Sequence, residues 1–148
     1  MDASKVKELR EKTGVSVMLC KKALEDSGGD EVGAMEWLKK QGVEAAEKKS
    51  GRSTKAGVME AYIHNNGQIG VLVELRSETD FVAKNPDFKE IAHNIALHIA
   101  ASCPDGTKDL LEQPYIKNPE ITIAEYLNES IQRFGENIEI ARFERFVL

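Results

Sequence analysis

The run of residues 58–76 limits the possible folds most, because two alternating apolar segments flank a turn signal. The signal is Asn65-Asn66-Gly67, and an Asn-Gly pair favours the positive φ angles of a two-residue hairpin turn. With Asn66 and Gly67 at the centre of the turn, Tyr62 pairs with Val71 across the two strands. The sequence therefore predicts an antiparallel hairpin with a fixed register.

Both faces of this predicted hairpin are apolar. One face carries Val58, Tyr62, Ile69, Val71, Val73 and Leu75, and the other carries Met59, Ala61, Ile63 and Leu72. A hairpin with one face in water has polar side chains on that face, so each face here needs a cover. We expect helices on one face and another sheet or a second subunit on the other.

Residues 4–42 predict three short helices, because apolar residues recur at helical spacing between turn residues. Ser16 and Asp30 are suited to cap the second and third helices. Each helix is followed by a glycine that can adopt the left-handed stop conformation, at Gly14, Gly28 and Gly42. We therefore expect a compact three-helix module over residues 1–42.

Residues 43–55 lose the apolar periodicity and become small and basic, which predicts a linker. Within it, Gly51-Arg52-Ser53-Thr54-Lys55 has a faint likeness to a phosphate loop. No strand precedes this segment, and the order of glycine, lysine and hydroxyl residues is wrong. We do not expect it to bind a nucleotide.

The rest of the chain, residues 56–148, predicts an α+β domain. After the hairpin, Asn85-Pro86-Asp87 supplies a cap, a proline at the first helical position and an acid in the first turn. Pro104 ends this helix, a loop follows, residues 123–134 predict another helix, and residues 137–146 predict a strand. The predicted fold is α+β: a three-helix module, then a small antiparallel sheet packed with helices.

Composition and charge narrow the function. The formal net charge of −5 argues against nucleic acid as the main partner, because that contact depends on Lys and Arg displacing counterions. No apolar run is long enough for a membrane span, and the first residues lack the apolar stretch of a signal peptide, so we expect a cytoplasmic protein. Cys20 and Cys103 lie far apart in helical patterns and are expected to be buried, reduced thiols.

The sequence offers no pattern for metal binding or covalent catalysis. His93 and His98 are spaced so that they turn away from each other on one helix, and no third ligand stands nearby. Neither serine nor cysteine lies in a nucleophile elbow. We expect no metal, no cofactor and no catalytic residue.

The segment Thr79-Asp80-Phe81-Val82-Ala83-Lys84-Asn85 places a phenylalanine beside a carboxylate where a strand gives way to a helix. Two interpretations follow from the residues alone. Phe81 either closes the core beneath the sheet or points outward to a partner. In the first case Thr79 or Asp80 only caps a short turn.

Two blocks of the chain resemble signatures of bacterial elongation factor Ts, the nucleotide exchange factor for the GTPase elongation factor Tu. They are LREKTGVSVMLCKKAL at residues 9–24 and ELRSETDFVAK at residues 74–84. Residues 93–101, the GENI sequence at residues 135–138 and the closing Arg-Phe repeats extend the likeness over essentially the whole chain. The sequence resembles a short member of that family with a single core subdomain.

The resemblance implies a ubiquitin-associated-like helical module (residues 1–42), a linker (43–55) and a core domain (56–148) that dimerises. It also implies that the turn Thr79, Asp80, Phe81 and Val82 contacts the GTPase, with Phe81 as a wedge whose insertion displaces magnesium. The helical module would dock through its exposed apolar residues, which we expect to be Leu9, Val17, Met18 and Leu19. The implied partners are elongation factor Tu and a second copy of the chain.

The chain departs from the family pattern at two positions. Leu19 replaces an acidic residue, so the side-chain half of a capping box after Ser16 is missing. Arg76 replaces an Asn, which puts a local hydrogen bond at the strand end in doubt. Two further hypotheses stay open beside the exchange factor: a translation-associated binding module without exchange activity, and a small hydrolase using Asp80 or His93.

Overall fold

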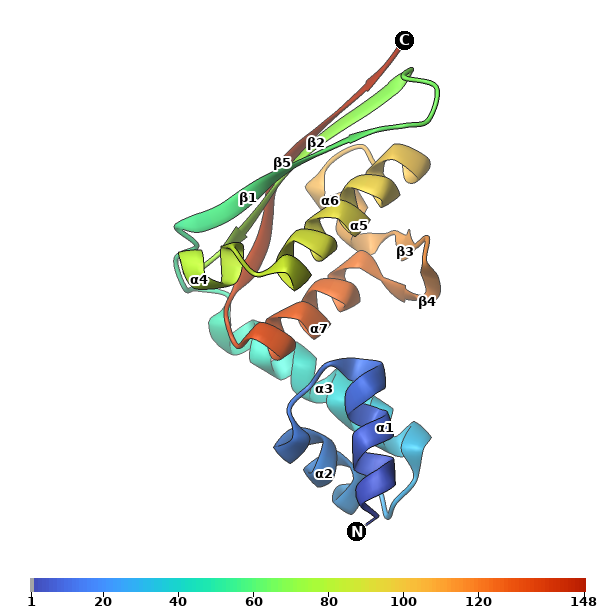
Figure 1. Ribbon diagram of the computed structural model, residues 1–148, viewed down its shortest axis with the longest axis vertical. Coiled ribbons are helices and arrows are strands. Elements are labelled where there is room, and N and C mark those ends of the chain that lie inside the picture. Colours follow the sequence, from blue (N-terminus) through green and yellow to red (C-terminus); the bar gives the residue numbers. More distant parts are fainter. Residues whose placement is uncertain (1) are drawn as a thin grey trace.

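A computed structural model describes residues 2–148, which form an elongated molecule with a helical module at one end and a larger α+β core at the other (Figure 1). The chain enters the core through the long helix α3. The hairpin tip and the C-terminus lie at the end of the sheet that is remote from the helical module (Figure 1). The α+β fold class is confirmed.

Three helices make up the helical module: α1 (Ala3–Thr13), α2 (Val17–Asp26) and α3 (Glu31–Lys49). The predicted caps are confirmed, because the Ser16 side chain accepts from the Leu19 amide and the Asp30 side chain accepts from the Gly33 amide. Gly14 ends α1 in the left-handed conformation with φ 69°. A separate cluster of buried side chains holds these helices together: Leu9, Val15, Cys20, Ala23, Leu24, Ala34 and Leu38.

The predicted helix stop at Gly42 is wrong. Helix α3 continues to Lys49, so the first half of the predicted linker is helical and only residues 50–55 connect it to the sheet. Gly42 is buried inside α3, where it faces α7. The signal at Gly42 reflects helix packing rather than a helix end. The division into residues 1–42, 43–55 and 56–148 remains a proposal, supported by two distinct clusters of buried side chains.

A three-stranded antiparallel sheet has the order β1 (Ala56–Ile63), β2 (Ile69–Ser77) and β5 (Ile138–Val147). The predicted register is confirmed, with Tyr62 opposite Val71 and Val58 opposite Leu75. The predicted two-residue turn at Asn66 and Gly67 is wrong. The Gly67 amide donates to the His64 carbonyl at 2.7 Å, and Gly67 is the turn residue with positive φ, at 72°.

The core also contains α4 (Asp80–Ala83), α5 (Pro86–Ser102), α6 (Thr107–Glu112), α7 (Ile123–Phe134) and a small β3 (Pro114–Tyr115) and β4 (Asn118–Thr122) pair. Helices α5 and α7 and strand β5 follow the predicted positions. The loop predicted between Pro104 and residue 123 instead contains α6, β3 and β4. Helix α6 has no side-chain cap and is anchored mainly by the buried Leu110, which explains its weak sequence signal.

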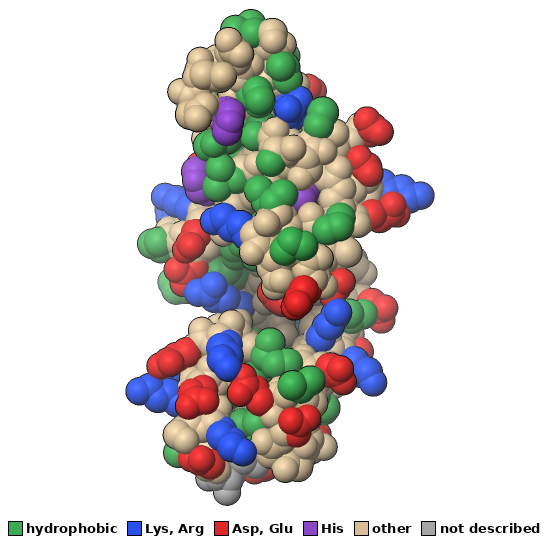
Figure 2. Space-filling view, turned by 90° about the vertical axis from the view of Figure 1, so that its right-hand side faces the viewer, with side chains coloured by type: hydrophobic (Ala, Val, Ile, Leu, Met, Phe, Trp, Pro, Cys, Tyr) green, Lys and Arg blue, Asp and Glu red, His purple; other side chains and the backbone are tan. Residues whose placement is uncertain are grey.

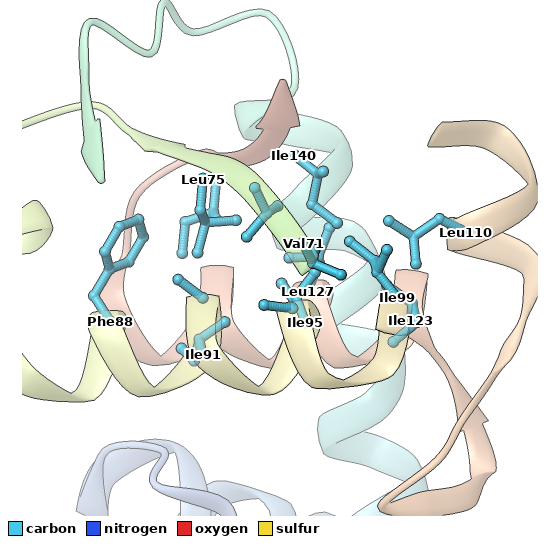
Figure 3. Close-up of a cluster of buried hydrophobic side chains, with 14 of the residues drawn as sticks. Val71, Leu75, Phe88, Ile91, Ile95, Ile99, Leu110, Ile123, Leu127 and Ile140 are labelled. Atoms are coloured by element: carbon cyan, nitrogen blue, oxygen red, sulfur yellow. The ribbon is translucent and has the colours of Figure 1, made fainter. Parts of the chain in front are cut away.

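Helices cover one face of the sheet, and the main core lies between this face and the helices. Figure 3 shows side chains from β2, α5, α6, α7 and β5 converging there, with Phe88 at one end and Leu110 at the other. Ile91, Ile95 and Ile99 lie along the inner side of α5. This side of α5 therefore forms one wall of the main core.

The opposite face of the sheet exposes an apolar group that we call the open-face patch: Met59, Ile63, Leu72 and Phe146. The strand register places Ile63, Leu72 and Phe146 near the hairpin tip, because Ile63 pairs with Gly70 and Gly70 with Phe146, whereas Met59 pairs with Glu74 farther along the sheet. Toward the other end the same face becomes charged, where Glu74 accepts from Arg76 at 2.8 Å and from Arg142 at 3.2 Å. The hydrogen bond from the Arg76 guanidinium, and to a lesser extent the one from Arg142, lowers the pKa of Glu74.

The helical module meets the core mainly through α3 and α7. Lys39 Nζ lies 2.5 Å from Glu125 Oε2 across this joint. Beside the pair is a groove of about 240 Å³, lined by residues that include Met35, Val43, Ile121 and Glu129. Figure 2 shows the molecule narrowing between its two parts.

The two cysteines have different environments. Cys20 is buried in the helical module as expected, but the expectation for Cys103 is wrong because its side chain is exposed. Cys103 ends α5 with φ 49°, where its amide donates to the Ile99 carbonyl. Across residues 2–148, no helix has both the length and the apolar character needed to cross a membrane.

Candidate functional site

The turn that carries Phe81 is built by the end of β2 and the start of a one-turn helix. Ser77 is the last residue of β2, and its hydroxyl donates to the Thr79 carbonyl at 3.0 Å. Thr79 then caps α4, because its hydroxyl accepts from the Val82 amide at 3.3 Å. The next helix starts at once with the predicted Asn85 cap, which accepts from the Asp87 amide at 2.9 Å.

Phe81 points into solvent with 88% of its surface exposed, although it is the largest apolar side chain of the turn. Its neighbours Val82 and Ala83 are buried in the core cluster. The single turn therefore separates an inner side, which holds α4 against the sheet, from an outer side, which presents the ring. Of the two interpretations left open by the sequence, the outward ring is confirmed, and the core-closing ring is wrong.

Val82 does not lie on the presented side. Its side chain is 6% exposed and packs in the core, so its role is to anchor the turn rather than to contact a partner. Asp80 is exposed next to Phe81, and among the described residues its carboxylate forms no hydrogen bond or ion pair. Thr79, Asp80 and Phe81 remain the proposed contact residues of this site.

A carboxylate from another part of the chain holds the turn from outside. Glu136, which follows the C-terminal cap of α7, accepts from the Glu78 amide at 3.1 Å and from the Thr79 amide at 3.0 Å. Its second oxygen accepts from the Thr79 hydroxyl at 2.7 Å. Sequence analysis did not identify Glu136 as a site residue. Its only signal was the GENI sequence at residues 135–138, which carries no information about distance to the turn.

The second predicted contact surface, on the helical module, is only partly exposed. Met18 and Val17 begin α2 with 80% and 51% of their surfaces exposed. Leu19 is half-buried against the module's core, and Leu9 is fully buried within it. The expectation that Leu9 is an exposed contact is therefore wrong, because its side chain is needed to hold the three helices together.

A shallow groove between α1 and α2 adjoins Val17. Its lining is an apolar floor with a basic rim and consists of Ala3, Val6, Lys7, Arg10, Val17 and Lys21. Figure 1 shows α2 and α4 as separate parts of the molecule, with α3 and the end of α7 between them. The two predicted sets of contact residues therefore form two surfaces rather than one.

The two departures from the family pattern have clear local consequences. Arg76 donates to Glu74 and also to the Thr54 carbonyl at 3.0 Å, so it fastens the residues that connect α3 and β1 to the end of β2. At Leu19, the Ser16 hydroxyl still accepts from the Leu19 amide at 3.3 Å. The cap is therefore kept without the returning acidic side chain.

The histidines on α5 are separated, as their spacing predicted. His93 Nδ1 lies 3.2 Å from Glu60 Oε1, near the edge of the Tyr62 ring. His98 is buried, where its Nδ1 accepts from the Ile116 amide and its Nε2 donates to Gln113 Oε1 at 2.9 Å. Burial lowers the pKa of His98 and so favours the neutral ring. Within residues 2–148, no cluster of His, Cys, Asp and Glu side chains is suited to a metal ion.

The chain is similar to proteins of one family. Residues 78–148, from the Phe81 turn to the C-terminus, match the family model described as "Elongation factor TS". The elongation factor Ts of Gloeothece citriformis is 43% identical over 99% of this chain and 67% of that protein. That of Desulfosudis oleivorans is 41% identical over 100% of this chain and 98% of that protein.

A third relative, the elongation factor Ts of Carboxydothermus hydrogenoformans, is 43% identical over 97% of this chain and 87% of that protein. These alignments are longer than the chain itself, since the one with the Desulfosudis protein spans 193 positions and this chain has 148 residues. The relatives therefore carry residues that have no counterpart here. The identity nevertheless extends over both the helical module and the core, and the chain belongs to the elongation factor Ts family.

Proposed function

We propose that this chain is a guanine nucleotide exchange factor that promotes GDP release from elongation factor Tu during translation elongation. Family membership supports this function, and the observation that carries it is the outward Phe81 ring beside the unpaired Asp80 carboxylate. A phenylalanine held in water at a rigid turn is unfavourable for the free protein. It becomes useful when a partner buries it.

The proposed mechanism is displacement without covalent chemistry. Phe81 enters between helices of the GTPase, and Asp80 makes a polar contact that orients the ring. The resulting shift disturbs the magnesium and phosphate-binding region of the partner, so GDP leaves without any bond being made or broken. The factor needs no cofactor, metal or catalytic residue of its own.

Thermodynamic linkage limits what Phe81 can do alone. A factor that weakens GDP binding is itself bound less tightly by the GDP form, and each tenfold change corresponds to about 1.4 kcal/mol of coupling. Burial of one phenylalanine contributes only about 1.5–3 kcal/mol. We therefore propose that the helical module supplies part of the binding free energy. It would do so through Met18, Val17 and the basic-rimmed groove between α1 and α2.

We also propose that the chain is a homodimer joined through the open-face patch. Met59, Ile63, Leu72 and Phe146 leave one side of the sheet apolar, while the helices cover only the other side. A second copy of the chain would cover this patch, and the resulting dimer would carry two Phe81 turns. The proposal puts the protein in the cytoplasm, where translation takes place.

The experiment that tests the exchange function uses elongation factor Tu loaded with a fluorescent GDP analogue. The expected result is that the purified chain accelerates analogue release in proportion to its concentration. A translation-associated binding module would associate with the GTPase and leave the release rate unchanged. A small hydrolase would show turnover that survives Phe81→Ala and disappears in Asp80→Asn.

A further inference from the structure

The Glu136 side chain stands where the sheet stops and the Phe81 turn begins. The ladder between β2 and β5 ends with Ser77 opposite Ile138. The ladder does not continue beyond that pair, so the amides of Glu78 and Thr79 have no strand partner. One oxygen of Glu136 accepts from both amides, at 3.1 and 3.0 Å, and thereby replaces the missing strand.

The arrangement is reciprocal, since each segment supplies a carboxylate to the other. Glu78 Oε2 accepts from the Asn137 amide at 2.7 Å and lies 3.5 Å from Arg52 Nη1. Asn137 is buried and also donates to the Arg52 carbonyl at 3.0 Å. Two side-chain carboxylates therefore lock the start of the Phe81 turn to the start of β5, and the residues after α3 join the same network.

Glu136 acts on the cap of α4 as well as on its approach. Its second oxygen accepts from the Thr79 hydroxyl at 2.7 Å, and the same hydroxyl accepts from the Val82 amide at 3.3 Å. Because the Thr79 hydroxyl donates its hydrogen to Glu136, its lone pairs are directed toward the Val82 amide of α4. The orientation of the one-turn helix, and with it the Phe81 ring, thus depends on a residue at the end of α7.

The geometry points to Glu136 as a positioning residue for nucleotide exchange, which holds the Phe81 turn in the conformation that a GTPase partner receives. This inference rests on the proposed exchange function. Helix α4 is a single turn, and isolated short helices are unstable in water, so an external anchor is needed to keep the ring in place. A preformed turn avoids the entropy cost of ordering it on binding.

The first arm of the test concerns the free chain and does not depend on exchange activity. Amide hydrogen exchange measured by NMR should be at least about tenfold faster at Glu78 and Thr79 in Glu136→Ala than in the wild type. Glu136→Gln keeps one acceptor oxygen and should retain most of the protection. Glu112→Ala is the matched control, because Glu112 is exposed and forms no side-chain hydrogen bond or ion pair within residues 2–148. Unchanged protection in Glu136→Ala overturns the inference.

The second arm follows release of a fluorescent GDP analogue from elongation factor Tu. Glu136→Ala should slow the exchange on the order of tenfold, and Glu136→Gln, which loses the acceptor for the Thr79 hydroxyl, should give a rate between that of Glu136→Ala and that of the wild type. In the Phe81→Ala background, adding Glu136→Ala should change the rate by no more than about threefold, well below its effect in the wild type, because the turn then positions only Thr79 and Asp80. Full additivity of the two substitutions overturns the inference, since Glu136 would then act independently of Phe81.

The two arms also separate this inference from the function on which it rests. If the wild-type chain does not accelerate release, the proposed function is wrong. The amide measurement then still decides whether Glu136 anchors the turn. If the wild type is active and both Glu136 variants match it, the function stands and the positioning role is wrong.

Discussion

Phe81 and Phe88 lie on consecutive helices in opposite environments: the Phe81 ring is 88% exposed, whereas Phe88 is fully buried and meets Phe134 edge-on at 6.1 Å. The two rings therefore have different roles, although they lie close together in the sequence. Phe88 holds α5 against the sheet and α7. Phe81 adds nothing to the core and is free for a partner.

This contrast predicts opposite effects on stability. Phe88→Ala should lower the free energy of unfolding by about 3–5 kcal/mol, because it leaves a cavity in the core. Phe81→Ala should change it by no more than about 0.5 kcal/mol, as is usual for an exposed position. Urea denaturation followed by circular dichroism compares the two variants directly. A large loss of stability in Phe81→Ala would mean that the ring packs inside the protein.

Gly42 predicts a stabilising substitution at the joint between α3 and α7. A Cβ at this position would lie 3.3 Å from the Gln132 side-chain oxygen, which can move, and 3.7 Å from the Asn128 carbonyl oxygen. Because alanine favours a helix interior over glycine, Gly42→Ala should raise the free energy of unfolding by about 0.5–1 kcal/mol. Thermal unfolding measures the change. Gly42→Leu is the contrasting variant and should destabilise, since its larger side chain would press on α7.

His98 predicts a loss of stability on mild acidification. Its folded-state pKa is lowered by burial, with an opposing smaller effect of the hydrogen bond to Gln113, so it lies below the unfolded value of about 6.5. As the pH falls below about 6.5, the unfolded chain takes up a proton that the folded chain resists, and the free energy of unfolding decreases. A protonated ring also cannot accept from the Ile116 amide.

Urea denaturation at about pH 7.5 and about pH 5.5 measures this effect. The wild type should lose more stability between these conditions than His98→Gln, which has no ring to titrate. His64→Gln is the control, because it removes a histidine ring from an exposed position outside the core. An identical pH dependence in the wild type and His98→Gln would contradict the account.

The open-face patch predicts that one charge on the uncovered side of the sheet disrupts self-association. Light scattering over a concentration series should give a dimer for the wild type and a monomer for Ile63→Lys, because residue 63 lies opposite Gly70 and a buried lysine without a partner is costly. Ile116→Lys introduces the same charge at an exposed apolar residue outside the patch and should remain dimeric. A wild type that is monomeric throughout the micromolar range would refute the dimer.

Much of the fold could be predicted because its signals are local. The caps at Ser16, Asp30 and Asn85 and the alternating runs around Gly67 each depend on neighbouring residues. The helix end predicted at Gly42 is wrong because a glycine can equally mark a helix end or a close contact between helices. The register with α7 that distinguishes these two uses is a property of the folded chain.

At the candidate site, too, the features that depend on neighbouring residues could be predicted, whereas those set by tertiary contacts could not. The position of the turn follows from the sequence, which left Thr79 and Asp80 as alternative caps, and the structure shows that Thr79 is the cap. The burial of Leu9 and Val82 depends on which side of a helix meets the core. Glu136 lies 57 positions from Thr79, and nothing local connects the two. Only the pairing of β2 with β5 brings its carboxylate to the turn.

The most direct test of the account compares the wild type with Phe81→Ala in the release of a fluorescent GDP analogue from elongation factor Tu. Removal of the ring should slow the exchange at least about tenfold, which corresponds to about 1.4 kcal/mol of lost coupling, while the fold stays intact. Ile116→Ala truncates an exposed apolar side chain between β3 and β4, a strand pair that Figure 1 shows on the far side of the core from α4, and should exchange at the wild-type rate. Wild-type exchange by a correctly folded Phe81→Ala protein would contradict the account.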